Sequence, residues 1–153
     1  MKILSVFFFL LFPLMAQSND DLSDNYLLCG YPYSDERKNI GVEFLNDKSV
    51  EIWKVKLNGT EEGVGYFNES VLLFHRYRTA INEISIDWSI LTLEEDWSPF
   101  MTIDRTTLKA KIITENHNTQ CKLVSKEEMF DQLQKEAVQI FEMNEEIRSK
   151  RQL

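Results

Sequence analysis

The chain has few of the residues that build metal sites, redox motifs and linkers: its 153 residues include 2 Cys, 2 His, 3 Pro and 5 Gly. Without a stretch rich in proline or glycine there is no candidate linker, which favours a single domain. The two cysteines do not form a CxxC pair, and His75 and His117 stand far apart with no HxH or HExxH spacing. These spacings argue against a zinc site and a thioredoxin-type motif. We therefore expect no metal ion and no cofactor.

The motifs that usually introduce enzyme chemistry are also absent. There is no GxSxG, no P-loop and no GxGxxG. Three consecutive acids, Glu94 to Asp96, would alternate between the two sides of a strand and could not flank one glycosidic bond. No catalytic residue is assigned, and the chain is predicted not to be an enzyme.

Positive charge is in short supply, with 17 Lys and Arg against 25 Asp and Glu and a net charge of −8. An acidic chain repels nucleic acid and anionic membranes and attracts basic partners at low ionic strength. Acidity can equally serve only solubility. We expect no nucleic-acid partner.

The longest uncharged apolar run lies at the N-terminus. Lys2 precedes a run from Ile3 to Met15, and Ala16-Gln17-Ser18 follows it. This order is typical of a secretory signal peptide over residues 1–18, and the run is shorter than the roughly 20 residues of a membrane-spanning helix. We predict cleavage after Ser18, with Ala16 as the alternative site and an uncleaved anchor as the competing interpretation. The protein is then exported, periplasmic or secreted, with no stable membrane anchor after cleavage.

Cys29 and Cys121 fit an exported protein with one disulfide bond. They lie in the first and the last strand candidates after residue 18, so a bond is expected to tie the two ends of the sheet together. Closing so long a loop is worth about 4 kcal/mol in the chain-entropy model. Two buried free thiols are the alternative.

Hydrophobic residues alternate with a period of two through residues 19–124. Ile40, Val42 and Phe44 share one strand face, and Asn58-Gly59 is the strongest turn signal. Further strands are expected near residues 26–31, 52–57, 63–68, 71–78, 84–90, 100–104, 108–114 and 119–124. About eight short strands at regular spacing predict an antiparallel β-barrel or sandwich.

The pattern changes at Ser125, which opens a capping box with Glu128. Residues 125–153 are predicted to form a C-terminal amphipathic helix, regular from about residue 126 to residue 148, packed on the β domain. Its apolar stripe recurs at three- and four-residue intervals and comprises Met129, Leu133, Ala137, Ile140 and Phe141, and later Ile147.

Aromatic residues are the remaining signal. Inward-pointing ones can line a ligand cavity, exposed ones can form a protein-binding patch, and core filling is the competing interpretation. Asn58 and Asn68 begin N-x-S/T glycosylation sequons, which matter only in a eukaryotic source. The candidate binding residues are Tyr31, Tyr33, Trp97, Phe100 and His75.

The order of a leader, an early cysteine, a β domain and a late cysteine resembles small exported β-barrels such as the membrane-bound lysozyme inhibitors of the C-type class. The resemblance is one of arrangement over Leu27 to Val124, and no functional residue is carried over from it. We expect a non-enzymatic, binding or inhibitor-like protein whose partner is a protein or a small ligand. The alternative is a carrier of a small hydrophobic ligand inside a barrel.

Overall fold

The computed structural model describes residues 20–31, 38–57, 64–68, 73–90 and 96–151. The predicted signal peptide, Tyr33, the Asn58-Gly59 turn and Glu94-Glu95 lie outside these ranges.

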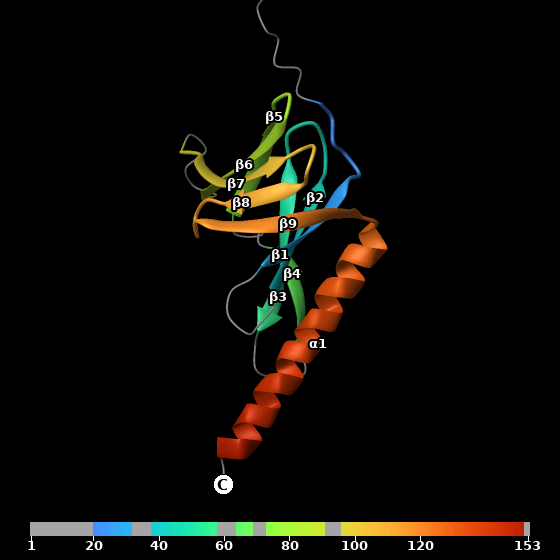
Figure 1. Ribbon diagram of the computed structural model, residues 1–153, viewed down its shortest axis with the longest axis vertical. Helices are drawn as coiled ribbons and strands as arrows, with labels where there is room; N and C mark the ends of the chain where they lie inside the picture. Colours follow the sequence, from blue (N-terminus) through green and yellow to red (C-terminus); the bar gives the residue numbers. More distant parts are fainter. Residues whose placement is uncertain (1–19, 32–37, 58–63, 69–72, 91–95, 152–153) are drawn as a thin grey trace, which may run out of the picture.

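Nine strands and one helix make up the described chain (Figure 1). All neighbouring strands are antiparallel and form one sheet in the order β4-β3-β2-β1-β9-β8-β7-β6-β5. The prediction of a mostly β fold with a C-terminal helix is confirmed. The elements are β1 (Tyr26–Tyr31), β2 (Lys38–Phe44), β3 (Val50–Leu57), β4 (Val64–Asn68), β5 (Leu73–Thr79), β6 (Glu83–Ile90), β7 (Ser98–Asp104), β8 (Lys109–Ile112), β9 (His117–Val124) and α1 (Lys126–Arg151).

The sheet curls until β5 meets the start of β3. Ser49 forms an isolated antiparallel bridge with Arg76, and the Tyr77 backbone N–H donates to the Lys48 carbonyl at 2.8 Å. The Tyr77 hydroxyl also donates to the Asn46 carbonyl at 2.7 Å. β4 pairs only with the second half of β3 and so extends the sheet beyond this junction. Eight strands therefore form a nearly closed barrel, with β4 attached to its edge.

Inward-pointing side chains from all eight barrel strands fill the interior. Phe44 and Tyr77, for example, meet edge to face with their ring centroids 5.0 Å apart. One end of the barrel is covered by the segment before β1, where the Leu22 N–H donates to the Tyr77 hydroxyl at 3.0 Å. The buried cluster comprises Leu27, Cys29, Ile40, Val42, Phe44, Val50, Ile52, Tyr77, Ile84, Ile86, Phe100, Met101, Ile103, Ala110, Ile112 and Cys121.

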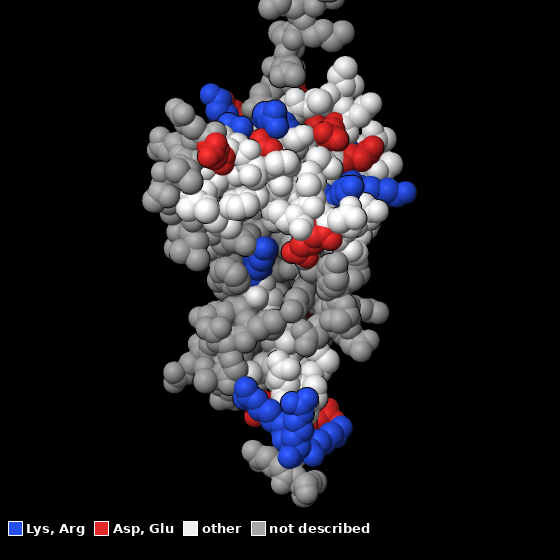
Figure 2. Space-filling model, turned by 90° about the vertical axis from the view of Figure 1, so that its left-hand side faces the viewer, with Lys and Arg blue, Asp and Glu red and all other residues white. Residues whose placement is uncertain are grey.

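The helix α1 packs across the outer face of β1 to β4 (Figure 1). The Ser125 hydroxyl accepts the Glu128 N–H at 3.1 Å, as the capping box predicts. Met129 and Leu133 are fully buried against Leu28, whereas Phe141, expected in the apolar stripe, is only half-buried. Basic side chains gather at the far end of α1 in Figure 2, where they complement the helix dipole; they are Arg148, Lys150 and Arg151.

A glycine lets α1 approach the sheet closely. A Cβ atom on Gly41 would lie 2.8 Å from the Met129 sulfur and 3.1 Å from Leu133 Cδ1. Two buried carboxylates lie at the interface between α1 and the sheet: Glu43 of β2 accepts from Lys126 Nζ of α1 at 2.7 Å, and Glu136 of α1 accepts from the Asn39 N–H at 2.9 Å. The helix is therefore held by polar contacts as well as by its apolar stripe.

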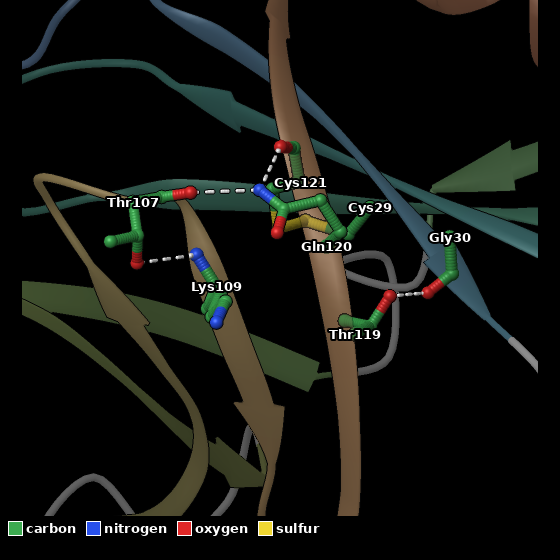
Figure 3. Close-up of a disulfide and its surroundings, with 7 residues drawn as sticks. All are labelled: Cys29, Gly30, Thr107, Lys109, Thr119, Gln120 and Cys121. Atoms are coloured by element: carbon green, nitrogen blue, oxygen red, sulfur yellow. Dashed lines mark hydrogen bonds between the residues drawn. A yellow bond between two sulfur atoms is a disulfide. The ribbon is translucent and has the colours of Figure 1, made fainter.

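The disulfide joins Cys29 to Cys121, which are direct cross-strand partners on β1 and β9. It does not tie the two ends of the sheet together, as the sequence analysis expected, because the first and last strands are neighbours in the middle of the sheet. Figure 3 shows further links around it: Gln120 Nε2 donates to the Thr107 carbonyl at 2.8 Å, and the Thr119 hydroxyl donates to the Gly30 carbonyl. β1, β8 and β9 are thus firmly connected here.

Candidate functional site

Two of the predicted binding residues meet inside the barrel. The His75 and Phe100 rings pack edge to face with their centroids 5.4 Å apart, and both residues are buried. Lys54 Nζ lies 5.5 Å from the centroid of the Phe100 ring. Tyr31 ends β1, but its side chain lies outside the description, as does Tyr33. The structure therefore brings together His75 and Phe100 and adds Lys54 to them.

The environment of His75 keeps its imidazole neutral. Burial lowers the pKa of His75 to about 4, the charge of Lys54 acts in the same direction, and a hydrogen bond with the Leu73 backbone partly opposes both. Neutral imidazole is therefore the dominant form at physiological pH. Enclosed against an aromatic ring, this histidine behaves as a core residue.

We expect the free energy of unfolding to fall by about 2 kcal/mol between pH 7 and pH 5 because of His75. Its pKa is lower in the folded protein, about 4, than the ordinary value of 6.5, so the unfolded chain binds more protons between these values. The contribution of His75 to the free energy of unfolding is fully present above pH 6.5 and is lost as the pH falls toward 4. Denaturant unfolding at both pH values measures the effect. In His75→Phe the loss should be smaller by about this amount, and an equal loss in both proteins would contradict the assignment.

No metal-binding group is formed within the described residues: no three His, Cys, Asp or Glu side chains lie close enough together to hold an ion. Over the same ranges, no helix combines the length and apolar composition needed to cross a membrane.

The outer face of β6 to β9 carries an open groove of about 1250 Å³. Ala110 and Ile112 of β8 point inward and are buried, so Lys109 and Lys111 point outward into the groove. They stand opposite Gln120 and Asn118 of β9, respectively. The groove is lined by Gly30, Asn39, Asn82, Glu83, Thr102, Asp104, Lys109, Ala110, Lys111, Asn118, Thr119 and Gln120.

The acidic side of the groove is committed to local contacts. Asp104 Oδ1 accepts the backbone N–H groups of Thr106 at 2.9 Å and Thr107 at 2.7 Å, and hydrogen bonds from Thr107 lower the pKa of Asp104. Glu83 accepts the Ser85 hydroxyl at 2.9 Å. The groove therefore offers a partner mainly lysine ammonium groups, amides and a threonine hydroxyl.

Next to the groove, four residues form what we call the arginine–tryptophan cluster: Arg76, Arg78, Asp87 and Trp97. Arg76 Nε and Arg78 Nη2 both contact Asp87 Oδ2, at 3.3 and 3.0 Å. The Arg76 guanidinium carbon lies 4.1 Å from the centroid of the Trp97 ring. Trp97, expected to be available to a partner, thus has one face occupied by an arginine of its own chain.

Sequence reasoning finds Trp97 but misses the other three members of this cluster. Arg76 and Asp87 are direct partners across β5 and β6, whose register is continuous. On the other side of β6, the pairing with β7 shifts between Ile86 and Asp87 and skips Phe100, close to Trp97. A bulge of this kind re-aims side chains and is not encoded in a period-two pattern. In the sequence, the only indication of this cluster was that Arg76 and Arg78 stand two positions apart and so share one face of β5.

Comparison with protein-family models, with curated proteins and with solved structures finds no match to this chain. The assignment of a site therefore depends on the chemistry of its own residues.

Proposed function

We propose that this chain is an exported, non-enzymatic binding protein that recognises a partner protein on the outer face of β5 to β9. The observation that carries the proposal is the difference between the two halves of the barrel exterior. α1 packs against β1 to β4, whereas the other half presents the polar groove and the arginine–tryptophan cluster. The outward residues of β6 connect them, since Glu83 lines the groove and Asp87 belongs to the cluster.

The packing of the interior favours this proposal over a hydrophobic-ligand carrier. A carrier needs an apolar cavity inside its barrel. Here inward side chains from all eight barrel strands pack against one another, and the groove lies outside them. The enclosed His75 likewise favours a binding protein over an enzyme that uses this histidine as a base, because a pKa of about 4 makes the imidazole a weak proton acceptor near pH 7.

Export is supported by two independent features. Residues 1–18 have the order of charge, apolar run and small residues typical of a secretory signal. The Cys29–Cys121 disulfide is consistent with an oxidising compartment outside the cytoplasm.

A photo-crosslinking experiment tests the recognition surface. Benzoyl-phenylalanine is placed at Lys111, in the groove, or at Glu142, an exposed position on α1. After exposure to the exported fraction of the source cells, we expect a crosslinked product of discrete mass at position 111 only. Identical products at both positions would contradict the proposal.

Calorimetric titration with palmitate tests the alternative. The packed interior predicts no saturable one-to-one binding. One-to-one binding of palmitate that leaves the crosslink at position 111 unchanged would favour the carrier instead.

A further inference from the structure

We infer that the arginine–tryptophan cluster binds an acidic segment of a partner protein, with a carboxylate side chain on the arginines and an adjacent apolar side chain beside them. This inference rests on the proposed function, because it assumes that a partner protein binds on the outer face of β5 to β9. It adds the chemistry that the partner must present.

The first step is the charge within the cluster. Two guanidinium groups share a single carboxylate, and both contact the same oxygen, Asp87 Oδ2. The four residues of the cluster therefore carry one positive charge in excess, on a chain whose net charge is −8. A guanidinium carries five N–H donors, and the side chain of Arg78 is 64% exposed. The cluster has the donors to bind a second carboxylate.

The second step is the rigidity of these donors. Asp87 is almost fully buried, with 6% of its side chain exposed, and Arg76 is stacked on Trp97. Both arginines are thus anchored to fixed points on the sheet. Holding an arginine in place before binding reduces the entropy lost on association, and its planar fork matches a carboxylate in two parallel hydrogen bonds.

The third step is the apolar surface beside the charges. Phe74 precedes Arg76 by two residues on β5, so both side chains point to the same outer face, and Phe74 is 45% exposed. Tryptophan and arginine are the residues enriched at the centres of protein interfaces. A carboxylate followed by an apolar side chain therefore complements the row of Arg78, Arg76 and Phe74.

The overall acidity of the chain does not oppose this contact at physiological salt. Charges more than about 8 Å apart are largely screened under these conditions. A carboxylate seated on Arg78 experiences mainly the two guanidinium groups, and the global charge acts on the rate of encounter more than on the contact itself.

The test is a titration of the protein at physiological salt with two blocked tetrapeptides, acetyl-Gly-Glu-Phe-Gly-amide and its Gln counterpart, followed by amide and indole NMR. We expect saturable shifts of the Trp97 indole resonance and an affinity about tenfold higher for the Glu peptide. Arg78→Gln should abolish this preference. Lys135→Gln, which removes a positive charge of similar exposure on α1, away from the proposed surface, should retain it.

Each contrary outcome overturns the inference in a recognisable way. Equal affinity for both peptides removes the carboxylate requirement. The same Trp97 shift with sodium acetate alone identifies a site for small anions, and a shift that follows protein concentration identifies a second copy of this chain as the occupant. If these results occur while the crosslink at position 111 forms, the proposed function stands and only the partner chemistry is wrong.

Discussion

Replacing Leu133 by alanine is expected to lower the free energy of unfolding by about 2–5 kcal/mol. Leu133 is fully buried between α1 and the sheet, in a cluster with Leu28 and Met129. Its Cδ1 atom would lie 3.1 Å from a Cβ on Gly41, so the helix and β2 are in close contact at this point. Shortening the Leu133 side chain would leave a cavity, and the hydrogen-bonded strands of the sheet cannot move inward to fill it.

The effect is measured by denaturant unfolding monitored by circular dichroism. Val138→Ala is the matched control, because it removes apolar atoms from the same helix at a position that is 39% exposed. We expect the control to change the free energy by less than about 1 kcal/mol. A change of less than about 1 kcal/mol for Leu133→Ala as well would indicate that docking of α1 does not stabilise the β domain.

Local patterns in the sequence were sufficient to predict the strands and the helix. The period-two alternation of Ile40, Val42 and Phe44 reports that one face of β2 is buried, and this requires no knowledge of the neighbouring strands. The start of α1 could be read from Ser125 and Glu128 because capping involves residues only three apart.

The sheet order depends on contacts that no local pattern encodes. β1 lies beside β9, and this neighbourhood follows from curling of the whole sheet until β5 reaches the start of β3. The expectation that the disulfide spans the ends of the sheet was wrong for this reason. In the same way, Glu43 of β2 and Glu136 of α1 read as solvent-facing acids until the helix is placed against the sheet.

The candidate site was only partly accessible to sequence reasoning. His75 was chosen for its chemistry and Phe100 as an aromatic of a loop-like segment expected to be available to a partner. They meet, but inside the core. The contacts of the arginines with Asp87 need the pairing of β5 with β6, and the position of Trp97 beside them needs the shifted pairing of β6 with β7. Charged residues on alternate positions of a strand ordinarily indicate a solvated face, which is why Arg76 and Arg78 carried no separate prediction.

The disulfide is expected to contribute about 4 kcal/mol to stability. Cys29 and Cys121 are 92 positions apart, so the bond closes a loop that contains most of the β domain and removes many conformations from the unfolded chain. Reduction should therefore lower the free energy of unfolding by about this amount, measured by denaturant titration with and without reductant. The double variant Cys29→Ala/Cys121→Ala should behave like the reduced protein, because alanine fits without strain at two positions that are almost fully buried.

The size of this effect bears on where the protein can work. Small domains have net stabilities of about 5–15 kcal/mol, so a loss of about 4 kcal/mol removes from about a quarter to most of that stability and raises the unfolded fraction on the order of a thousandfold. We expect the protein retained in a reducing cytoplasm without residues 1–18 to be degraded or aggregated, while the exported, oxidised form persists. Equal unfolding free energies for the oxidised, reduced and Cys29→Ala/Cys121→Ala proteins would show that pairing of β1 with β9 already holds this part of the barrel. The fold would then impose no requirement for an oxidising compartment, and export would depend on the leader alone.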